Sequence, residues 1–332
     1  MQSVGDMARS LVLRTNQVQL RQQMDKLAVE VATGFAKDSA KKLGGDTTSL
    51  LAIDRTLAKL DAYKINTTEA TYVTTSMQNA MDEMQQRSQT LSQTLIAADL
   101  TPNSTLLKTM SDDAENAMAQ VLNGMNRQVA GRFLFSGTAT DQPAVQGVDV
   151  MMNELRTALA GATTAADVNT TLDSFFGAGG AFETTVYQGS NNGLSPMQLS
   201  ETESASVDIK ATDQAFRDIL KPMAMAAIAT DGTLGLSGDV QVDLLAQSGR
   251  DLLGAQTSIV ELRASLGALE GRIEETVARN SAEITSTQLA RLELVGVDEF
   301  ETATKYESVR GQLESLYAIT ARSQRLSLAE YL

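Results

Sequence analysis

The most regular hydrophobic pattern of the chain lies toward its C-terminus. Apolar and small side chains recur there at alternating steps of three and four residues without a slip. This spacing predicts one long helix with a heptad stripe, which can be buried only against other helices. The stripe consists of Leu252, Ala255, Ile259, Leu262, Leu266, Leu269, Ile273, Thr276, Asn280, Ile284 and Thr287.

A second stripe follows after a break at residues 294–298, which contain Gly296. It consists of Tyr306, Val309, Leu313, Leu316 and Thr320 and continues toward the end of the sequence. A hydrophobic stripe in this position predicts that the chain ends pair with another surface rather than close a self-contained globule.

The N-terminal residues 1–35 also have the pattern of one amphipathic helix, ended by Gly34. One seam is made of Leu13, Gln17, Leu20, Met24, Leu27 and Val31. A partly offset stripe is made of Val4, Ala8, Leu11, Thr15 and Val18. Two offset stripes predict that this helix contacts more than one neighbour.

Two further helices are predicted over residues 47–98 and 105–130. Within the first, Thr67, Thr71 and Thr74 occupy the seam, and we expect this stretch to be partly solvated. We expect residues 47–130 and 240–292 to pack as an antiparallel bundle, and the two terminal helices to lie side by side.

The middle of the chain, residues 139–235, has clustered glycines and several prolines. Helices are expected at 149–159, 166–175 and 213–228, and strands at 182–189 and 205–210. The predicted fold is therefore mainly α: an elongated antiparallel helical bundle with paired N- and C-terminal coiled-coil helices and an inserted small α+β domain. The expected division is a terminal coiled-coil domain (1–35 and 297–332), a helical rod domain (36–138 and 236–296) and an inserted variable domain (139–235).

The amino-acid composition excludes several classes of catalytic and metal site. The chain has no histidine and no cysteine, so histidine-based catalysis, thiol chemistry and the commonest zinc ligands are excluded. The neighbours Asp112 and Asp113 would point to different sides of a helix, and residues 189–193 do not form a nucleophile elbow. We expect no enzymatic activity, no cofactor and no metal site.

Charge excludes two classes of partner. The net charge is −14, and nucleic-acid binding needs a basic surface. Anionic membranes would repel the chain for the same reason, and no stretch has the length of a membrane span. The N-terminus lacks the apolar core of a secretory signal, so export, if it occurs, is expected to use a route without signal cleavage.

Three stretches resemble the flagellin superfamily, and within it the hook-associated proteins. They are GRFLFSGTATDQP at residues 131–143, VYQGS at 186–190, and the ending LSLAEYL at 326–332. The ending is the most specific, since the FSGT run is shared with flagellins, and the resemblance covers most of residues 1–137 and 240–332. Residues 41–46, KKLGGD, replace the Pro-Ser-Asp-Asp-Pro turn of many members and look closer to a branch seen in some alphaproteobacteria.

The resemblance implies a structural subunit of the bacterial flagellum at the hook–filament junction, secreted through the flagellar type III apparatus. Its implied partners are neighbouring copies of itself, other hook-associated proteins and flagellin, and an export chaperone that binds the C-terminal helices. The resemblance also implies that the terminal helices are frayed in the monomer and become ordered by packing against neighbouring subunits. The candidate assembly residues are Leu13, Leu20, Met24, Leu27, Val309, Leu313, Leu316, Leu326, Leu328, Tyr331 and Leu332.

Two other functions share the heptad pattern. A filament-forming flagellin would have the same fold and would polymerise alone, whereas the ending at Tyr331-Leu332 and the modest middle domain favour the junction. A secreted coiled-coil adhesin or needle-tip protein would have no reason to end as this chain does.

Overall fold

The computed structural model describes the backbone of residues 4–329 and the side chains of residues 7–322. The chain divides into two compact units, one of residues 1–61 with 281–332 and one of residues 62–280. Both boundaries lie inside long helices, α3 (Thr48–Ala97) and α8 (Gly238–Val295). The three-domain division expected from the sequence stays a prediction.

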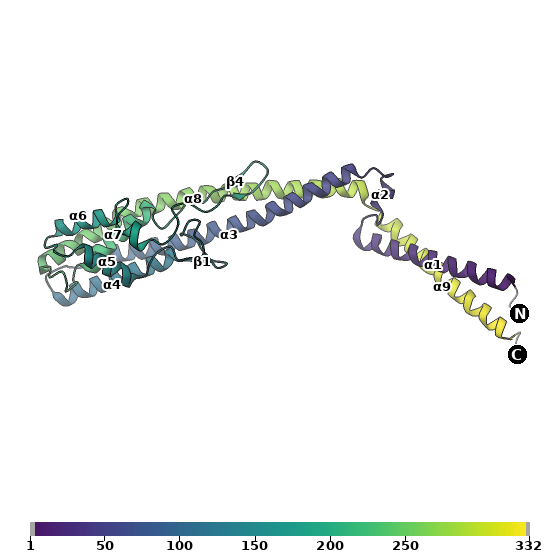
Figure 1. The fold of residues 1–332 in the computed structure, drawn as a ribbon, viewed down its shortest axis with the longest axis horizontal. Coiled ribbons are helices and arrows are strands. Elements are labelled where there is room, and N and C mark those ends of the chain that lie inside the picture. Colours follow the sequence, from purple (N-terminus) through teal and green to yellow (C-terminus); the bar gives the residue numbers. More distant parts are fainter. Residues whose placement is uncertain (1–3, 330–332) are drawn as a thin grey trace. The chain divides into compact units, whose positions relative to one another are not determined.

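The unit of residues 62–280 is built on antiparallel segments of α3 and α8. The Gln78 side chain of α3 donates to the Arg263 carbonyl of α8 at 2.8 Å, and Ser92 donates to the Gly249 carbonyl at 2.7 Å. Four shorter helices gather around one part of this pair (Figure 1). They are α4 (Ser104–Met125), α5 (Val148–Ala158), α6 (Ala165–Phe176) and α7 (Gln214–Ile228). The predicted mainly-α fold class is confirmed.

The heptad stripe explains why α8 is buried where it is. The stripe residues of α8 from Leu252 to Thr287 are all buried or half-buried. In α3, the predicted seam position Thr71 is exposed, and its neighbour Ala70 is buried instead. The expected solvation around Thr67 and Thr74 is wrong, since both are buried.

A hairpin strap is hydrogen-bonded to both long helices beside this polar stretch. Strands β3 (Met197–Gln198) and β4 (Ser204–Ala205) pair antiparallel. The Asn66 side chain of α3 donates to the Gln198 carbonyl at 2.8 Å, and the buried Asn280 amide of α8 donates to the Leu199 carbonyl at 2.8 Å. We call residues 197–205 the strap; they bond to both long helices near the end of this unit.

A second hairpin corrects the predicted end of the third helix. Helix α4 ends at Met125, not near residue 130, because the Asn126 side chain both donates to and accepts from the backbone of Val145. Strands β1 (Gln128–Val129) and β2 (Arg132–Phe133) then pair across a tight turn. Ala130 and Gly131 form that turn with positive φ angles of 49° and 76°.

The strand expected at 182–189 is wrong. Residues Phe182–Val186 form a π-helical turn, η1. Phe182 and Val186 are buried while Thr184 between them is exposed, whereas in a strand all three side chains would lie on the same face. Only Tyr187 forms a bridge, with Val145. At 205–210 the expected alternation of burial is present, but regular pairing is confined to Ser204 and Ala205.

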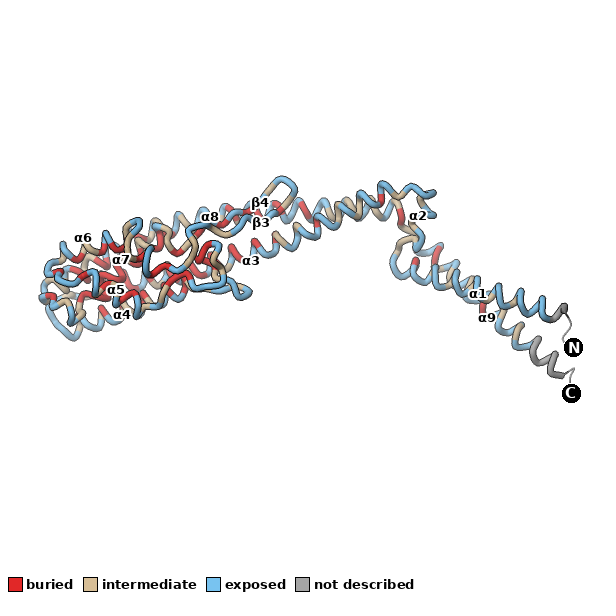
Figure 2. Tube along the Cα trace, viewed as in Figure 1, coloured by how far each residue is buried: buried red, intermediate tan, exposed pale blue. Residues whose placement is uncertain are grey.

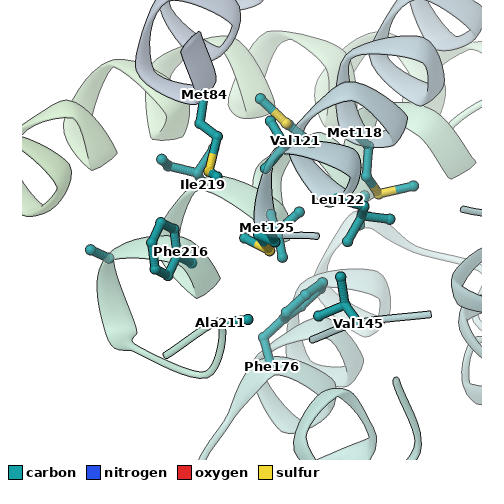
Figure 3. Close-up of a cluster of buried hydrophobic side chains, with 14 of the residues drawn as sticks. Met84, Met118, Val121, Leu122, Met125, Val145, Phe176, Ala211, Phe216 and Ile219 are labelled. Carbon is teal, nitrogen blue, oxygen red and sulfur yellow. The ribbon is translucent and has the colours of Figure 1, made fainter. Parts of the chain in front are cut away.

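The main cluster of buried hydrophobic residues lies in this unit, between Ala70 and Ile273. Buried residues gather among α4–α7 and the adjoining segments of α3 and α8 (Figure 2). Unbranched methionines fill much of it: Met84 lies beside Phe216 and Ile219, and Met118 lies beside Leu122 (Figure 3). Methionine suits irregular gaps between helices because its side chain is flexible.

The end of helix α7 and the residue after it, residues 222–229, are buried on every side within this core. Two buried hydroxyls hold its backbone. Ser111 of α4 donates to the carbonyls of Ala226 and Ala227 at 2.8 and 2.7 Å, and Ser248 of α8 donates to the carbonyl of Pro222 at 2.5 Å. The polar contacts thus attach α7 to helices on two sides.

Candidate assembly interface

The other compact unit contains α1 (Val4–Thr33), the short α2 (Ser39–Lys42), the start of α3, the end of α8, and α9 (Glu299–Ala329). Helix α1 ends at Gly34, whose φ of 73° is the left-handed conformation expected of a glycine after a helix. Helix α9 begins after Asp298, whose carboxylate accepts from the Glu301 amide at 2.8 Å. Each helix therefore has a defined end beside the other.

Two backbone hydrogen bonds join the loops at these ends. The Ala36 amide donates to the Val295 carbonyl at 2.8 Å, and the Val297 amide donates to the Gly34 carbonyl at 2.9 Å. Phe35 and Gly296 form an antiparallel bridge between them. This connection, which we call the elbow, fixes where α1 and α9 start to pair.

Side chains reinforce the elbow. The Arg291 guanidinium lies over the Phe35 ring, 4.5 Å from its centroid, and its Nε donates to Asp54 at 2.8 Å. The Lys42 ammonium group donates to the Gly296 carbonyl. The apolar periodicity did not identify these residues, because a loop-to-loop contact leaves no repeat in the sequence.

The expected seam residues lie along the pairing sides of α1 and α9. Leu13, Leu20, Met24 and Leu27 of α1 are half-buried, as are Val309 and Leu316 of α9, while Leu313 is buried. Leu326 and Leu328 lie in α9, but their side chains are outside the described residues, as are Tyr331 and Leu332 altogether. The role of these residues in assembly stays a prediction.

One position of the expected seam is wrong. Val31 is 39% exposed, and Glu30 is buried in its place. The Glu30 carboxylate accepts from the Lys37 amide at 3.1 Å and lies 3.6 Å from the Lys26 ammonium group. The loop after α1 turns back over this carboxylate, so the last turn buries a charged side chain that is hydrogen-bonded.

Several apolar side chains of α1 are exposed among the described residues. Met7, Leu11 and Val18 are 58%, 67% and 49% exposed. Leu11 and Val18 belong to the offset stripe seen in the sequence. We call Met7, Leu11, Thr15 and Val18 the outer stripe. Its exposure agrees with the expectation that α1 contacts more than one neighbour.

Polar contacts set the register of the pair. The Tyr317 hydroxyl accepts from Arg21 Nη2 at 2.8 Å, from Arg21 Nε at 3.0 Å and from Gln17 at 3.4 Å. These donors favour the phenolate, so the hydrogen bond from Gln17 first and those from Arg21 next lower the pKa of Tyr317. Sequence periodicity missed Arg21 and Tyr317, which flank the seam.

The two middle stretches that carry the resemblance lie against each other in the second unit. The Thr138 amide donates to the Asn192 carbonyl at 2.9 Å, and the Ser190 amide donates to the Ser136 carbonyl at 2.8 Å. Gly137 has a φ of 61°, and a Cβ there would overlap the carbonyl oxygens of Ser190 and Asn192. The FSGT and YQGS runs are thus two halves of one backbone junction, in which glycine permits close approach.

Two features of the described residues bear on other functions. No group of three or more acidic, histidine or cysteine side chains there is arranged to hold a metal ion. Within the same residues, each helix is too short or too polar for a membrane-spanning segment. The polar and apolar groups of the α1–α9 pair instead form a helix-pairing surface.

The chain is similar to known proteins in its C-terminal helices and in its fold. Residues 252–332 match the family model of the bacterial flagellin C-terminal helical region. The structure is similar to the crystal structure of Bacillus cereus FlgL, with a TM-score of 0.51 and 13% identity over 73% of this chain and 100% of that chain. A putative flagellar hook-associated protein from Vibrio parahaemolyticus gives a TM-score of 0.41 and 14% identity over 74% and 99% of the two chains.

No curated protein gives a significant match to the sequence. The matched family region includes the second half of α8 and all of α9, the helices that carry the C-terminal stripes. Residues 252–332 are therefore similar to the flagellin C-terminal helical region, and the fold is similar to that of Bacillus cereus FlgL.

Proposed function

We propose that this protein is a structural subunit of the bacterial flagellum, placed at the hook–filament junction and assembled through its terminal helices after type III export. The single observation that carries the proposal is the exposed apolar surface on α1, a helix paired with a flagellin-type C-terminal region. A subunit of a continuous assembly needs such surfaces at its ends, because each must be covered by a neighbour. The proposal excludes an enzymatic role.

The proposed partners follow from the same surface. Neighbouring copies cover part of it, and other hook-associated proteins and flagellin contact the two rims of the junction. Before export, a chaperone that binds α9 would shield side chains such as Ile319, which is 55% exposed. The unusual KKLGGD turn supports placement in the alphaproteobacterial-like branch.

Removal of residues 300–332 tests the proposal directly. We expect the truncated protein to lose assembly and to fail to restore motility in cells lacking the native protein, while export and folding of residues 62–280 persist. Folding is measured by near-ultraviolet circular dichroism and hydrogen exchange, and assembly by electron microscopy of labelled hooks. Unchanged assembly would contradict the proposal.

A point-variant pair separates assembly from stability. Leu11→Gln with Val18→Gln changes the outer stripe, and Ile65→Gln changes an equally exposed residue of α3 in the other unit. We expect the first variant to lose self-association and the second to keep it. Equal loss of self-association in both variants would mean that the outer stripe of α1 has no specific role in assembly.

The second candidate function, a filament-forming flagellin, is favoured by the family match alone, since the matched model is that of flagellin. It makes a different prediction. A flagellin would polymerise alone into long filaments, whereas the junction protein would bind hook ends and nucleate filaments of added flagellin. Electron microscopy of the purified protein, with and without isolated hooks, decides between them.

A further inference from the structure

A groove runs along one side of the α1–α9 pair. It has a volume of about 800 Å³ and is lined by residues of both helices. Half-buried Leu20 and Leu316 lie in it, and its walls carry the amide side chains of Asn16, Gln19, Gln23 and Gln312. None of its described lining residues is charged.

The amides of the groove are available to a ligand. Gln312 makes only a long contact of 3.5 Å to Ser308. Within the described part of the chain, Asn16, Gln19 and Gln23 form no side-chain hydrogen bond. The groove therefore has apolar carbon at its centre and free hydrogen-bond donors and acceptors along both walls. This pattern is suited to binding another helix.

Gly311 gives the groove its depth. It lies inside α9, and a Cβ built there would meet no atom within 4 Å. Glycine weakens an exposed helix relative to alanine, so neither helix stability nor internal packing calls for it. Close approach of a neighbouring backbone would account for it, and Ser308 and Ser315 beside it on α9 are also small.

The outer stripe of α1 fits this groove chemically. Met7, Leu11, Thr15 and Val18 are uncharged and exposed, so they match an uncharged groove, and the long side chain of exposed Arg14 at the edge of the stripe can keep its guanidinium in water. At roughly 100° per residue, this stripe and the groove wall of Asn16, Gln19 and Gln23 lie on different sides of α1. The same molecule therefore presents both surfaces at once.

We infer that the α1–α9 groove receives the outer stripe of α1 from a second copy of this chain. This inference rests on the proposed assembly function and names its contact. Because the two surfaces differ, the contact is heterologous: each copy offers a groove to one neighbour and a stripe to another. Repetition of such a contact builds a ring or a helical array rather than a closed symmetric pair.

Gly311→Leu in the full-length protein tests the inference. The leucine fills the groove, and because leucine favours helix more than glycine does, amide protection of α9 in dilute protein should hold or increase. Self-association, measured by sedimentation velocity, should weaken by about tenfold or more, as expected when a close-packed interface centre is blocked. Gly271→Leu is the matched control, since Gly271 is also inside a helix with open space around it.

A mixing experiment identifies the occupant. Gly311→Leu retains the stripe, and the Leu11→Gln, Val18→Gln variant retains the groove. At a concentration where the wild type just associates, neither variant should associate alone, but together they should form a 1:1 complex. If no complex forms although each variant is folded, the stripe is not the occupant and the inference is overturned.

The remaining outcomes are distinguishable. If wild type associates and Gly311→Leu associates equally well, the groove inference is overturned while the proposed function stands. If wild type fails to associate at any concentration and also fails to bind hooks, the proposed function falls and the inference falls with it. If Gly271→Leu weakens association as much as Gly311→Leu, the groove has no special role.

Discussion

Arg21 of α1 and Tyr317 of α9, 296 positions apart in sequence, form a hydrogen-bonded pair in which the guanidinium also approaches the phenol ring to 5.9 Å from its centroid. The contact joins the two terminal helices at a site that the heptad seam does not include. It also gives the pair a titratable reporter. The pKa of Tyr317 is lowered, whereas burial raises the pKa of Tyr187 in the other unit to about 12.

We expect alkaline titration to separate these two phenols among the six tyrosines. Tyr317 should ionise below its ordinary value near 10, and Arg21→Gln should move its pKa upward. Because its folded pKa is depressed, Tyr317 adds stability above about pH 10, and that contribution is lost as pH falls through the folded pKa. Absorbance at phenolate wavelengths, compared with Tyr317→Phe, measures the shift.

Tyr187 should behave in the opposite sense. Its pKa is raised, so the protonated phenol, which donates to the Ser190 carbonyl at 2.7 Å, stabilises the fold. That stability is present below about pH 10 and is lost as pH rises to about 12. Tyr187→Phe should remove this pH dependence from the unfolding of residues 62–280; an unchanged dependence would contradict the assignment.

The Asn280 amide should hold the strap in place. Asn280→Ala leaves the Leu199 carbonyl without its 2.8 Å donor, which costs about 1–3 kcal/mol for a buried group. Denaturant unfolding measures the loss, and hydrogen exchange of residues 197–205 locates it. Asn66→Ala removes the more exposed bond to Gln198, so its effect should be smaller; the reverse order would mean that Asn280 does not anchor the strap.

Gly137 should be intolerant of a side chain. Gly137→Ala places a Cβ against two backbone oxygens in a left-handed conformation, so we expect a loss of more than about 2 kcal/mol in unfolding free energy. Gly131→Ala is the control, because Gly131 also has positive φ but open space around it. Its cost should be about 1 kcal/mol, and equal costs would show that the junction with residues 190–192 is not tight.

Gly296 should be required for the elbow. In Gly296→Ala, the new methyl group would overlap the Leu292 carbonyl oxygen, and relief of that overlap would move the bridge to Phe35. A steric cost of about 1–3 kcal/mol corresponds to roughly tenfold faster exchange of the Val297 and Ala36 amides, measured by NMR. Gly45→Ala, at an open turn in the same unit, should leave both amides unchanged.

The sequence predicted the features that repeat and missed those that occur once. The stripe from Leu252 to Thr287 is buried as expected, because heptad spacing alone determines which side of α8 faces α3. By contrast, the elbow, the strap and the Arg21–Tyr317 pair each join segments far apart in sequence through single contacts. No period marks such contacts, and Thr67 and Thr74 looked solvated because what covers them lies far along the chain.

The two serine hydroxyls that hold α7 have a consequence for the uniqueness of the core. Residues 222–229 at the end of α7 are buried on every side, and apolar packing alone would allow this segment several azimuthal orientations at similar hydrophobic free energy. Ser111 and Ser248 remove this degeneracy, because a turn of one residue about the axis would carry both sets of acceptor carbonyls out of reach and strand buried donors. The two serines thereby hold α7 in one rotational orientation within a methionine-rich core that could otherwise repack.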